Sequence, residues 1–157
     1  MQSRLDYFAA APKTMQGMVA FEQHIQGCGL EHSLMELVKT RASQINGCAY
    51  CIHMHTRDAR AAGETEERLY LVSAWAESPL YTPRERAALA WTDALTRIAE
   101  SHPSDALYED VSAQFTEEEL VALTLLIGGI NVWNRINVGF HGVHPHEQTD
   151  NAAMAEG

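Results

Sequence analysis

The chain has 157 residues, enough for one domain with a substantial core, and its 11 basic and 21 acidic side chains give a formal net charge of −10. Because it has no lysine- or arginine-rich run, nucleic acid and anionic membranes are not expected as partners. No apolar stretch is long enough for a membrane span or a signal peptide, so the prediction is a soluble, cytoplasmic protein. Three cysteines in such a protein favour redox or metal chemistry over a disulfide scaffold.

The first half of the chain predicts three helices. Apolar residues at helical spacing indicate one helix over residues 12–26 and a second over residues 32–44. A third follows an Asn-Gly turn, begins near Cys48 and ends at Gly63, a residue that often terminates helices. Arg41 falls inside the apolar stripe of the second helix, so it needs a partner for its charge, and we interpret it as structural.

The second half of the chain predicts four further helical segments, with two capping motifs. These segments cover residues 65–76, 82–101, 104–114 and 116–133. A threonine followed three residues later by glutamate opens the second and fourth of them, as in a capping box. In the last segment, Gly128-Gly129 indicates close approach of a neighbouring helix.

No segment has the alternating pattern of a strand, so the predicted fold is all-α, with six to eight helices in a single domain. This domain is expected over residues 1–145, followed by a flexible C-terminal tail over residues 146–157. The histidines near the tail, His141, His144 and His146, are weak candidate metal ligands, but a solvated tail is the simpler interpretation.

The segment from Asn46 to His55 carries the strongest chemical motif. On a helix that advances about 100° per residue, with Cys48 at zero, Cys51 falls at about 300° and His55 at about 340°. These three side chains therefore share one helix face, whereas His53 points elsewhere. Thiols at a helix N-terminus, near a base or in a Cys-x-x-Cys motif form thiolates more readily, and a second thiol nearby can convert a sulfenic acid into a disulfide.

Two questions stay open from the residues alone. Helix position favours Cys48 as the attacking thiol, whereas the nearby His55 favours Cys51. Glu36 points away from the apolar stripe of its helix, so it either caps that helix with Ser33, is solvated, or approaches the thiol face of the next helix.

The stretch from Glu36 to His55 reads ELVKTRASQINGCAYCIHMH and resembles the AhpD-like alkylhydroperoxidase core of the carboxymuconolactone decarboxylase superfamily. Residues 82–91 and 130–135 are also similar to that family. The resemblance implies an all-helical homo-oligomer, commonly a trimer or hexamer. It also implies reduction of hydroperoxides with a dithiol protein or small thiol as reductant, without a metal or organic cofactor.

Carried over by position, the resemblance makes Cys51 the peroxidatic thiol, Cys48 the resolving thiol, and Glu36 with His55 a proton relay. Tyr50 departs from the founding AhpD proteins, which have a histidine there; a phenol is a poor base near neutral pH but can donate a hydrogen bond.

Two further residues are predicted in the substrate pocket with Tyr50. Trp133 and Asn134 place polar groups at the end of a buried helix, where they mark either a site wall or an interface. Decarboxylase members of the superfamily lack the thiol pair, so that activity is not expected.

Three alternatives remain. The chain is a redox-responsive or stress-related oligomer with slow turnover; or Cys48, Cys51, His55 and Glu36 bind zinc; or the cysteines are inert apolar fillers.

Overall fold

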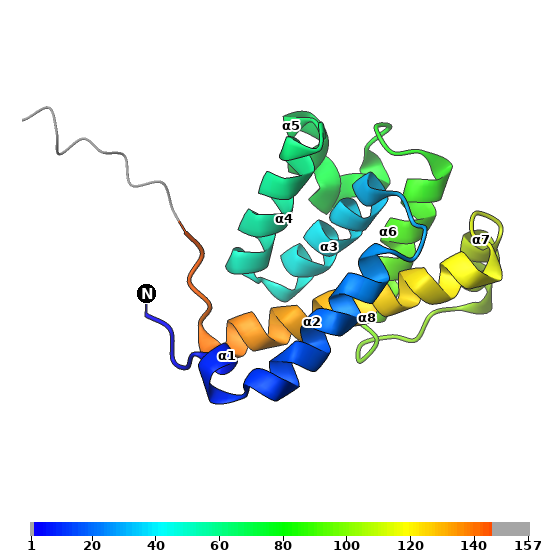
Figure 1. Cartoon of the computed structure of the whole chain (residues 1–157). Helices are drawn as coiled ribbons and strands as arrows, with labels where there is room; N and C mark the ends of the chain where they lie inside the picture. Colours follow the sequence, from blue (N-terminus) through cyan, green and yellow to red (C-terminus); the bar gives the residue numbers. More distant parts are fainter. Residues whose placement is uncertain (1, 146–157) are drawn as a thin grey trace, which may run out of the picture.

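The computed structural model describes residues 2–145, which form eight α-helices and one 3₁₀ helix and contain no strand (Figure 1). The predicted all-α fold is confirmed; the tail predicted over residues 146–157 lies outside the described residues. The elements are α1 (Tyr7–Ala10), α2 (Pro12–Gln26), α3 (His32–Asn46), α4 (Ala49–Ala61), α5 (Glu66–Leu71), η1 (Val72–Glu77), α6 (Pro83–Thr96), α7 (Asp105–Ser112) and α8 (Glu117–Phe140).

Helices α3 and α8 form the centre of the bundle. Helix α3 packs against α4, α6 and α8. Helix α2 lies against α8, and α3, α4 and α6 all lie on one side of these two helices (Figure 1). The main core cluster combines apolar side chains of α2, α3, α6, α7 and α8. By length and composition α8 would suffice to cross a membrane, but 50% of its most apolar window is buried inside the bundle, the position of a core helix.

The turn between α3 and α4 fixes the start of the cysteine motif. Gly47 has φ 65°, a left-handed conformation that suits glycine, and ends α3. Cys48 is the N-cap of α4, and its Sγ accepts a hydrogen bond from the backbone N–H of Cys51 at 3.3 Å. Because the turn is short, the first turn of α4 is held against α3 and its cysteines are directed into the bundle.

Most predicted helix boundaries agree with the structure, and Thr82 and Thr116 form the predicted capping boxes. Arg41 is also paired as expected, with Asp93 at 2.6 Å. The helix predicted to reach residue 101 ends instead at Thr96, where the chain continues in turns toward Pro103.

The last helix is longer than its apolar run predicts. The prediction ended it at residue 133, but α8 continues to Phe140 because buried asparagines in its final turns find hydrogen-bond partners. The short α1 was not predicted, and η1 is a 3₁₀ helix within the segment predicted over residues 65–76.

The two adjacent glycines of α8 are expected to respond oppositely to alanine. A Cβ on Gly129 would lie 2.8 Å from a ring carbon of Phe21 on α2, whereas a Cβ on Gly128 would meet nothing within 4 Å. Gly128→Ala should therefore gain up to about 1 kcal/mol from helix propensity, and Gly129→Ala should be less stable than Gly128→Ala by about 1–3 kcal/mol. Urea unfolding followed by circular dichroism measures both; equal stabilities would show that Phe21 does not pack closely on Gly129.

Candidate active site

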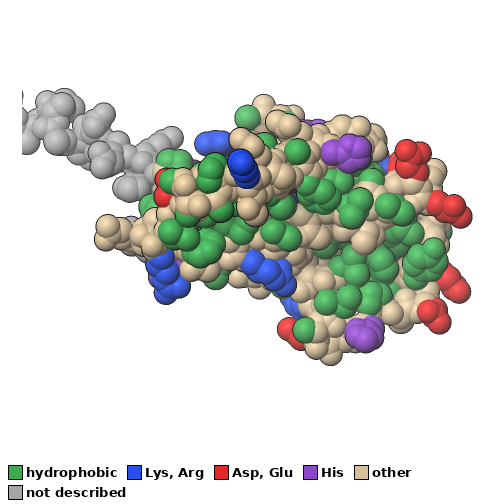
Figure 2. All heavy atoms as spheres, turned by 60° about the horizontal axis from the view of Figure 1, so that its bottom comes forward, with side chains coloured by type: hydrophobic (Ala, Val, Ile, Leu, Met, Phe, Trp, Pro, Cys, Tyr) green, Lys and Arg blue, Asp and Glu red, His purple; other side chains and the backbone are tan. Residues whose placement is uncertain are grey.

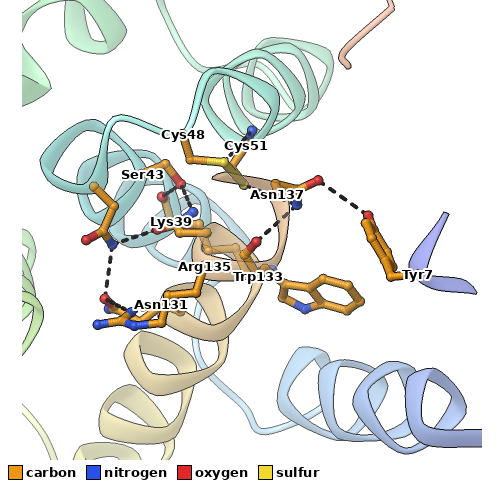
Figure 3. Close-up of a disulfide and its surroundings, with 11 residues drawn as sticks. Tyr7, Lys39, Ser43, Cys48, Cys51, Asn131, Trp133, Arg135 and Asn137 are labelled. Atoms are coloured by element: carbon orange, nitrogen blue, oxygen red, sulfur yellow. Dashed lines mark hydrogen bonds between the residues drawn. A yellow bond between two sulfur atoms is a disulfide. The ribbon is translucent and has the colours of Figure 1, made fainter. Parts of the chain in front are cut away.

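The two cysteines of the motif are joined in a disulfide (Figure 3). Their Cα atoms are 5.4 Å apart. Each cysteine is only 1% exposed, so the pair lies inside the bundle, where Ala42 and Ile130 complete a small cluster around it. The structure therefore presents the oxidised form of the pair.

Glu36 and His55 form a buried ion pair or hydrogen bond between α3 and α4. Nδ1 of His55 lies 2.8 Å from Oε2 of Glu36, and the two residues are 6% and 5% exposed. The interpretation of Glu36 as a solvated residue or a cap with Ser33 is wrong, because the packing of α3 on α4 buries its carboxylate. An ionised carboxylate only accepts hydrogen bonds, so beside it the Nδ1–H of His55 is the donor, and in this tautomer Nε2 carries no proton and can accept one.

A buried lysine adjoins this pair and was missed in the sequence. Lys39, 3% exposed, follows Glu36 by three residues on α3. Its Nζ lies 2.7 Å from Oε1 of Glu22 on α2 and 3.7 Å from Oε1 of Glu36. The spacing of Glu36 and Lys39 on one helix face was a signal for their contact, but the partner on α2 was not visible in the pattern.

A cavity of about 530 Å³ opens beside these groups. It is lined by residues from α1, α2, α3, α4 and α8: Tyr7, Phe8, Glu22, Gln26, His32, Met35, Glu36, Lys39, Tyr50, Cys51, Met54, His55, Asp58, Ile130, Trp133 and Asn137. Cys51 is among them and Cys48 is not. The structure thus brings Cys51, Glu36 and His55 to one cavity together with Tyr50 and Trp133, two of the predicted pocket residues.

Asn137 connects the sulfur of Cys51 to the N-terminal segment. Its Nδ2 donates to the backbone carbonyl of Trp133 at 3.1 Å and lies 3.7 Å from Sγ of Cys51. Its Oδ1 accepts a hydrogen bond from the hydroxyl of Tyr7 at 3.3 Å (Figure 3). Burial, and then the neighbouring Tyr50, raise the pKa of Tyr7 above its ordinary value, so its phenol stays protonated as a donor.

The structure places the third predicted pocket residue, Asn134, outside the lining of the cavity. Asn134 is buried. Its Nδ2 donates to Oγ of Ser43 at 3.0 Å and its Oδ1 accepts from Asn46 at 2.9 Å, so it ties α8 to the end of α3. The asparagine that reaches the cavity is Asn137, three residues later.

The zinc alternative requires the thiols of both Cys48 and Cys51 as ligands, and in this structure the two sulfurs are joined to each other. Among residues 2–145, no group of three or more histidine, cysteine or acidic side chains is placed to hold a metal ion. His144, proposed as a weak ligand, instead stacks its ring on His53 with 4.7 Å between the ring centroids. His146 lies outside the described residues.

Comparisons with known proteins agree with this fold. The sequence profile of the carboxymuconolactone decarboxylase family matches residues 12–94. YdfG, an uncharacterized protein of Bacillus subtilis, is 43% identical over 138 residues, which cover 88% of this chain and 94% of YdfG. YnjA, an uncharacterized protein of Escherichia coli, is 30% identical over 108 residues, 69% of this chain and 59% of YnjA.

Solved structures extend the comparison. A protein of unknown function from Agrobacterium tumefaciens, described as a candidate antioxidant defence protein AhpD, is 46% identical, with a TM-score of 0.91 over 93% of this chain and 100% of the other. The debrominase Bmp8 is 18% identical, with a TM-score of 0.79 over 88% of this chain and 74% of its own, and shares the fold alone. The chain belongs to the carboxymuconolactone decarboxylase family and has its AhpD-like helical fold.

Proposed function

We propose that this protein is a thiol-dependent peroxidase that reduces hydroperoxides and is regenerated by a dithiol protein or small thiol. The observation that carries the proposal is the meeting of Cys51 with the buried Glu36–His55 pair at one cavity, while Cys48 lies behind it in disulfide contact. This combination would supply a nucleophile in the wall of the cavity, a base and a resolving thiol within one fold.

The reaction begins with the reduced pair. His55, with its Nδ1 proton held by Glu36, accepts the proton of the Cys51 thiol at Nε2. The Cys51 thiolate attacks the distal oxygen of the hydroperoxide, the O–O bond breaks, and the relay returns a proton to the leaving alkoxide, which departs as an alcohol. The Cys51 sulfenic acid then reacts with the Cys48 thiol, which forms the disulfide and releases water. A dithiol donor reduces the disulfide by exchange and is itself oxidised.

The walls of the cavity support organic hydroperoxides as substrates. Tyr7, Phe8, Tyr50 and Trp133 contribute aromatic surface, and Met35, Met54 and Ile130 add apolar surface. A cavity of about 530 Å³ accommodates an alkyl or aryl group in addition to the peroxide itself. The phenol of Tyr50 is a donor that can orient the peroxide oxygens.

We also propose a cytoplasmic homo-oligomer, a trimer or hexamer. The support is an apolar stripe on the outer face of α8, where Val121, Leu125 and Val132 are exposed. Figure 2 shows apolar side chains over much of the face on which α2 and α8 lie. Monomeric proteins seldom expose large continuous apolar surfaces, and a second copy of the chain would cover this one.

The proposed function is tested by counting thiols before and after one equivalent of an alkyl hydroperoxide. The reduced protein has three thiols, and we expect rapid loss of two thiols and two hydrogen atoms, with Cys28 left free. Intact mass, thiol titration and peptide mapping should assign the new bond to Cys48 and Cys51. The matched Cys28→Ser variant should lose both of its thiols.

Unchanged thiols under these conditions would mean that the chain has the family fold without peroxide chemistry. Fast disulfide formation combined with very slow turnover across a series of dithiol donors would instead favour the redox-responsive oligomer.

A further inference from the structure

We infer that Lys39 is a positioning residue of this site: its ammonium pairs with the Glu36 carboxylate, and this carboxylate keeps His55 in the tautomer that accepts a proton at Nε2. The inference rests on the proposed function of the Glu36–His55 pair and extends it to a residue whose ammonium pairs with Glu36 and Glu22.

The two oxygens of Glu36 have different partners. Oε2 is hydrogen-bonded to Nδ1 of His55 at 2.8 Å, while Oε1 lies 3.7 Å from Nζ of Lys39. With an exposed fraction of 3%, the Lys39 ammonium lacks the hydration that a surface lysine has. A buried ammonium needs negative partners nearby, and here they are Glu36 and Glu22.

The charges around Lys39 come from three helices. Glu22 lies on α2, Glu36 and His32 on α3, and His55 on α4. His32 is 4.0 Å from Glu36 Oε1 but its side chain is largely exposed, so water screens it. Asp58 of α4 lines the same cavity. The described cluster therefore has two buried or half-buried carboxylates that share one buried ammonium.

Loss of the Lys39 ammonium changes how many protons the Glu36–His55 pair holds and where they lie. Without Lys39, burial and the second carboxylate both favour a protonated Glu36–His55 pair. A protonated Glu36 donates to Nδ1 of His55, which moves the ring proton to Nε2, and a protonated Nε2 cannot accept the proton of a thiol. Because the two groups share protons, the effect belongs to the pair as a unit.

Two substitutions should shift the pair in opposite directions. Lys39→Gln removes the cation, so the pH at which Cys51 becomes reactive should rise by about one unit. Glu22→Gln removes the competing carboxylate and leaves the ammonium to Glu36 alone, so this pH should fall. Lys39→Arg keeps the positive charge and should stay near the parent value. Lys13, the other lysine, is exposed on α2, and Lys13→Gln should have no effect.

The experiment measures Cys51 alkylation by iodoacetamide against pH in a Cys28→Ser, Cys48→Ser background, where Cys51 is the remaining thiol. Serine at position 48 retains an N-cap for α4. The same variants are then exposed to an alkyl hydroperoxide. Because alkylation involves no peroxide, a shifted alkylation profile in protein that does not react with peroxide would overturn the proposed function and still support the role of Lys39.

An unchanged midpoint in Lys39→Gln, or shifts of Lys39→Gln and Glu22→Gln in the same direction, would overturn the inference. Should Lys39→Gln fail to fold, as judged by circular dichroism, Glu22→Gln decides the question: a fall in the midpoint supports the inference and an unchanged midpoint overturns it.

Discussion

Cys51→Ser is expected to abolish both oxidation by an alkyl hydroperoxide and turnover, whereas Cys48→Ser should lose turnover but keep the first oxidation. Cys51 lines the cavity, while Cys48 is the N-cap of α4 and lies behind it. The two substitutions therefore block different steps of the reaction: Cys51→Ser blocks the attack on the peroxide, and Cys48→Ser blocks formation of the disulfide. Each variant should lower disulfide-dependent turnover by about a thousandfold or more, as loss of a covalent group does in other enzymes.

A single-turnover reaction separates the two steps. In Cys48→Ser, the protein should gain one oxygen atom at Cys51, and dimedone should trap it as the sulfenic acid adduct. Cys51→Ser should form no adduct, and Cys28→Ser should behave as the parent protein. A dimedone adduct on Cys48 in the Cys51→Ser variant would reverse the assignment of the two thiols.

The parts of the site that lie on one helix could be predicted from the sequence. Cys48, Cys51 and His55 share a face because helix geometry alone relates residues three and four positions apart. The same reasoning identified Arg41 as a charge within an apolar stripe, and the structure supplies its partner in Asp93, on another helix. The hydrophobic periodicity of a helix shows that a buried charge needs a partner, but it does not identify the residue on another helix that provides it.

Contacts between helices account for what the pattern could not decide. Glu36 and His55 are separated by 19 residues, and their meeting depends on how the Gly47 turn returns α4 along α3. A helical wheel gives the direction of Glu36 and leaves its neighbour unknown. Only the resemblance to a known family favoured the site over the cap, and although Lys39 lies within the stretch that carries this resemblance, the pattern assigns it no role.

The far ends of the chain were the least predictable. Tyr7 and Asn137 are 130 residues apart, and Asn137 and Cys51 are 86 apart, so no local pattern relates them. A signal did exist in α8, where Asn131, Asn134 and Asn137 recur at intervals of three residues. This spacing continues the helical period past the apolar run, whereas hydrophobicity alone ends the helix at residue 133 and therefore indicates Asn134 in place of Asn137.

The second large effect is expected from Glu36→Gln. Glutamine has nearly the same shape, so it fills the space between α3 and α4, but it removes the charge that fixes the His55 tautomer. The rate of Cys51 oxidation at neutral pH should fall by about a hundredfold or more, the usual contribution of a positioned acid or base. Rapid mixing with an alkyl hydroperoxide, followed by thiol quantification, measures this rate. Glu109→Gln, an exposed glutamate of α7, is the matched control and should be unaffected.

The relay also predicts how Glu36 and His55 combine. If Glu36 acts through His55, a variant with both Glu36→Gln and His55→Gln should be about as slow as His55→Gln alone, because the carboxylate has nothing left to orient. Independent roles would instead multiply the two losses. Circular dichroism should show that all three variants are folded, since removal of either partner leaves a buried polar group to be satisfied. Multiplicative losses in folded variants would show that Glu36 acts on the reaction by a route other than His55.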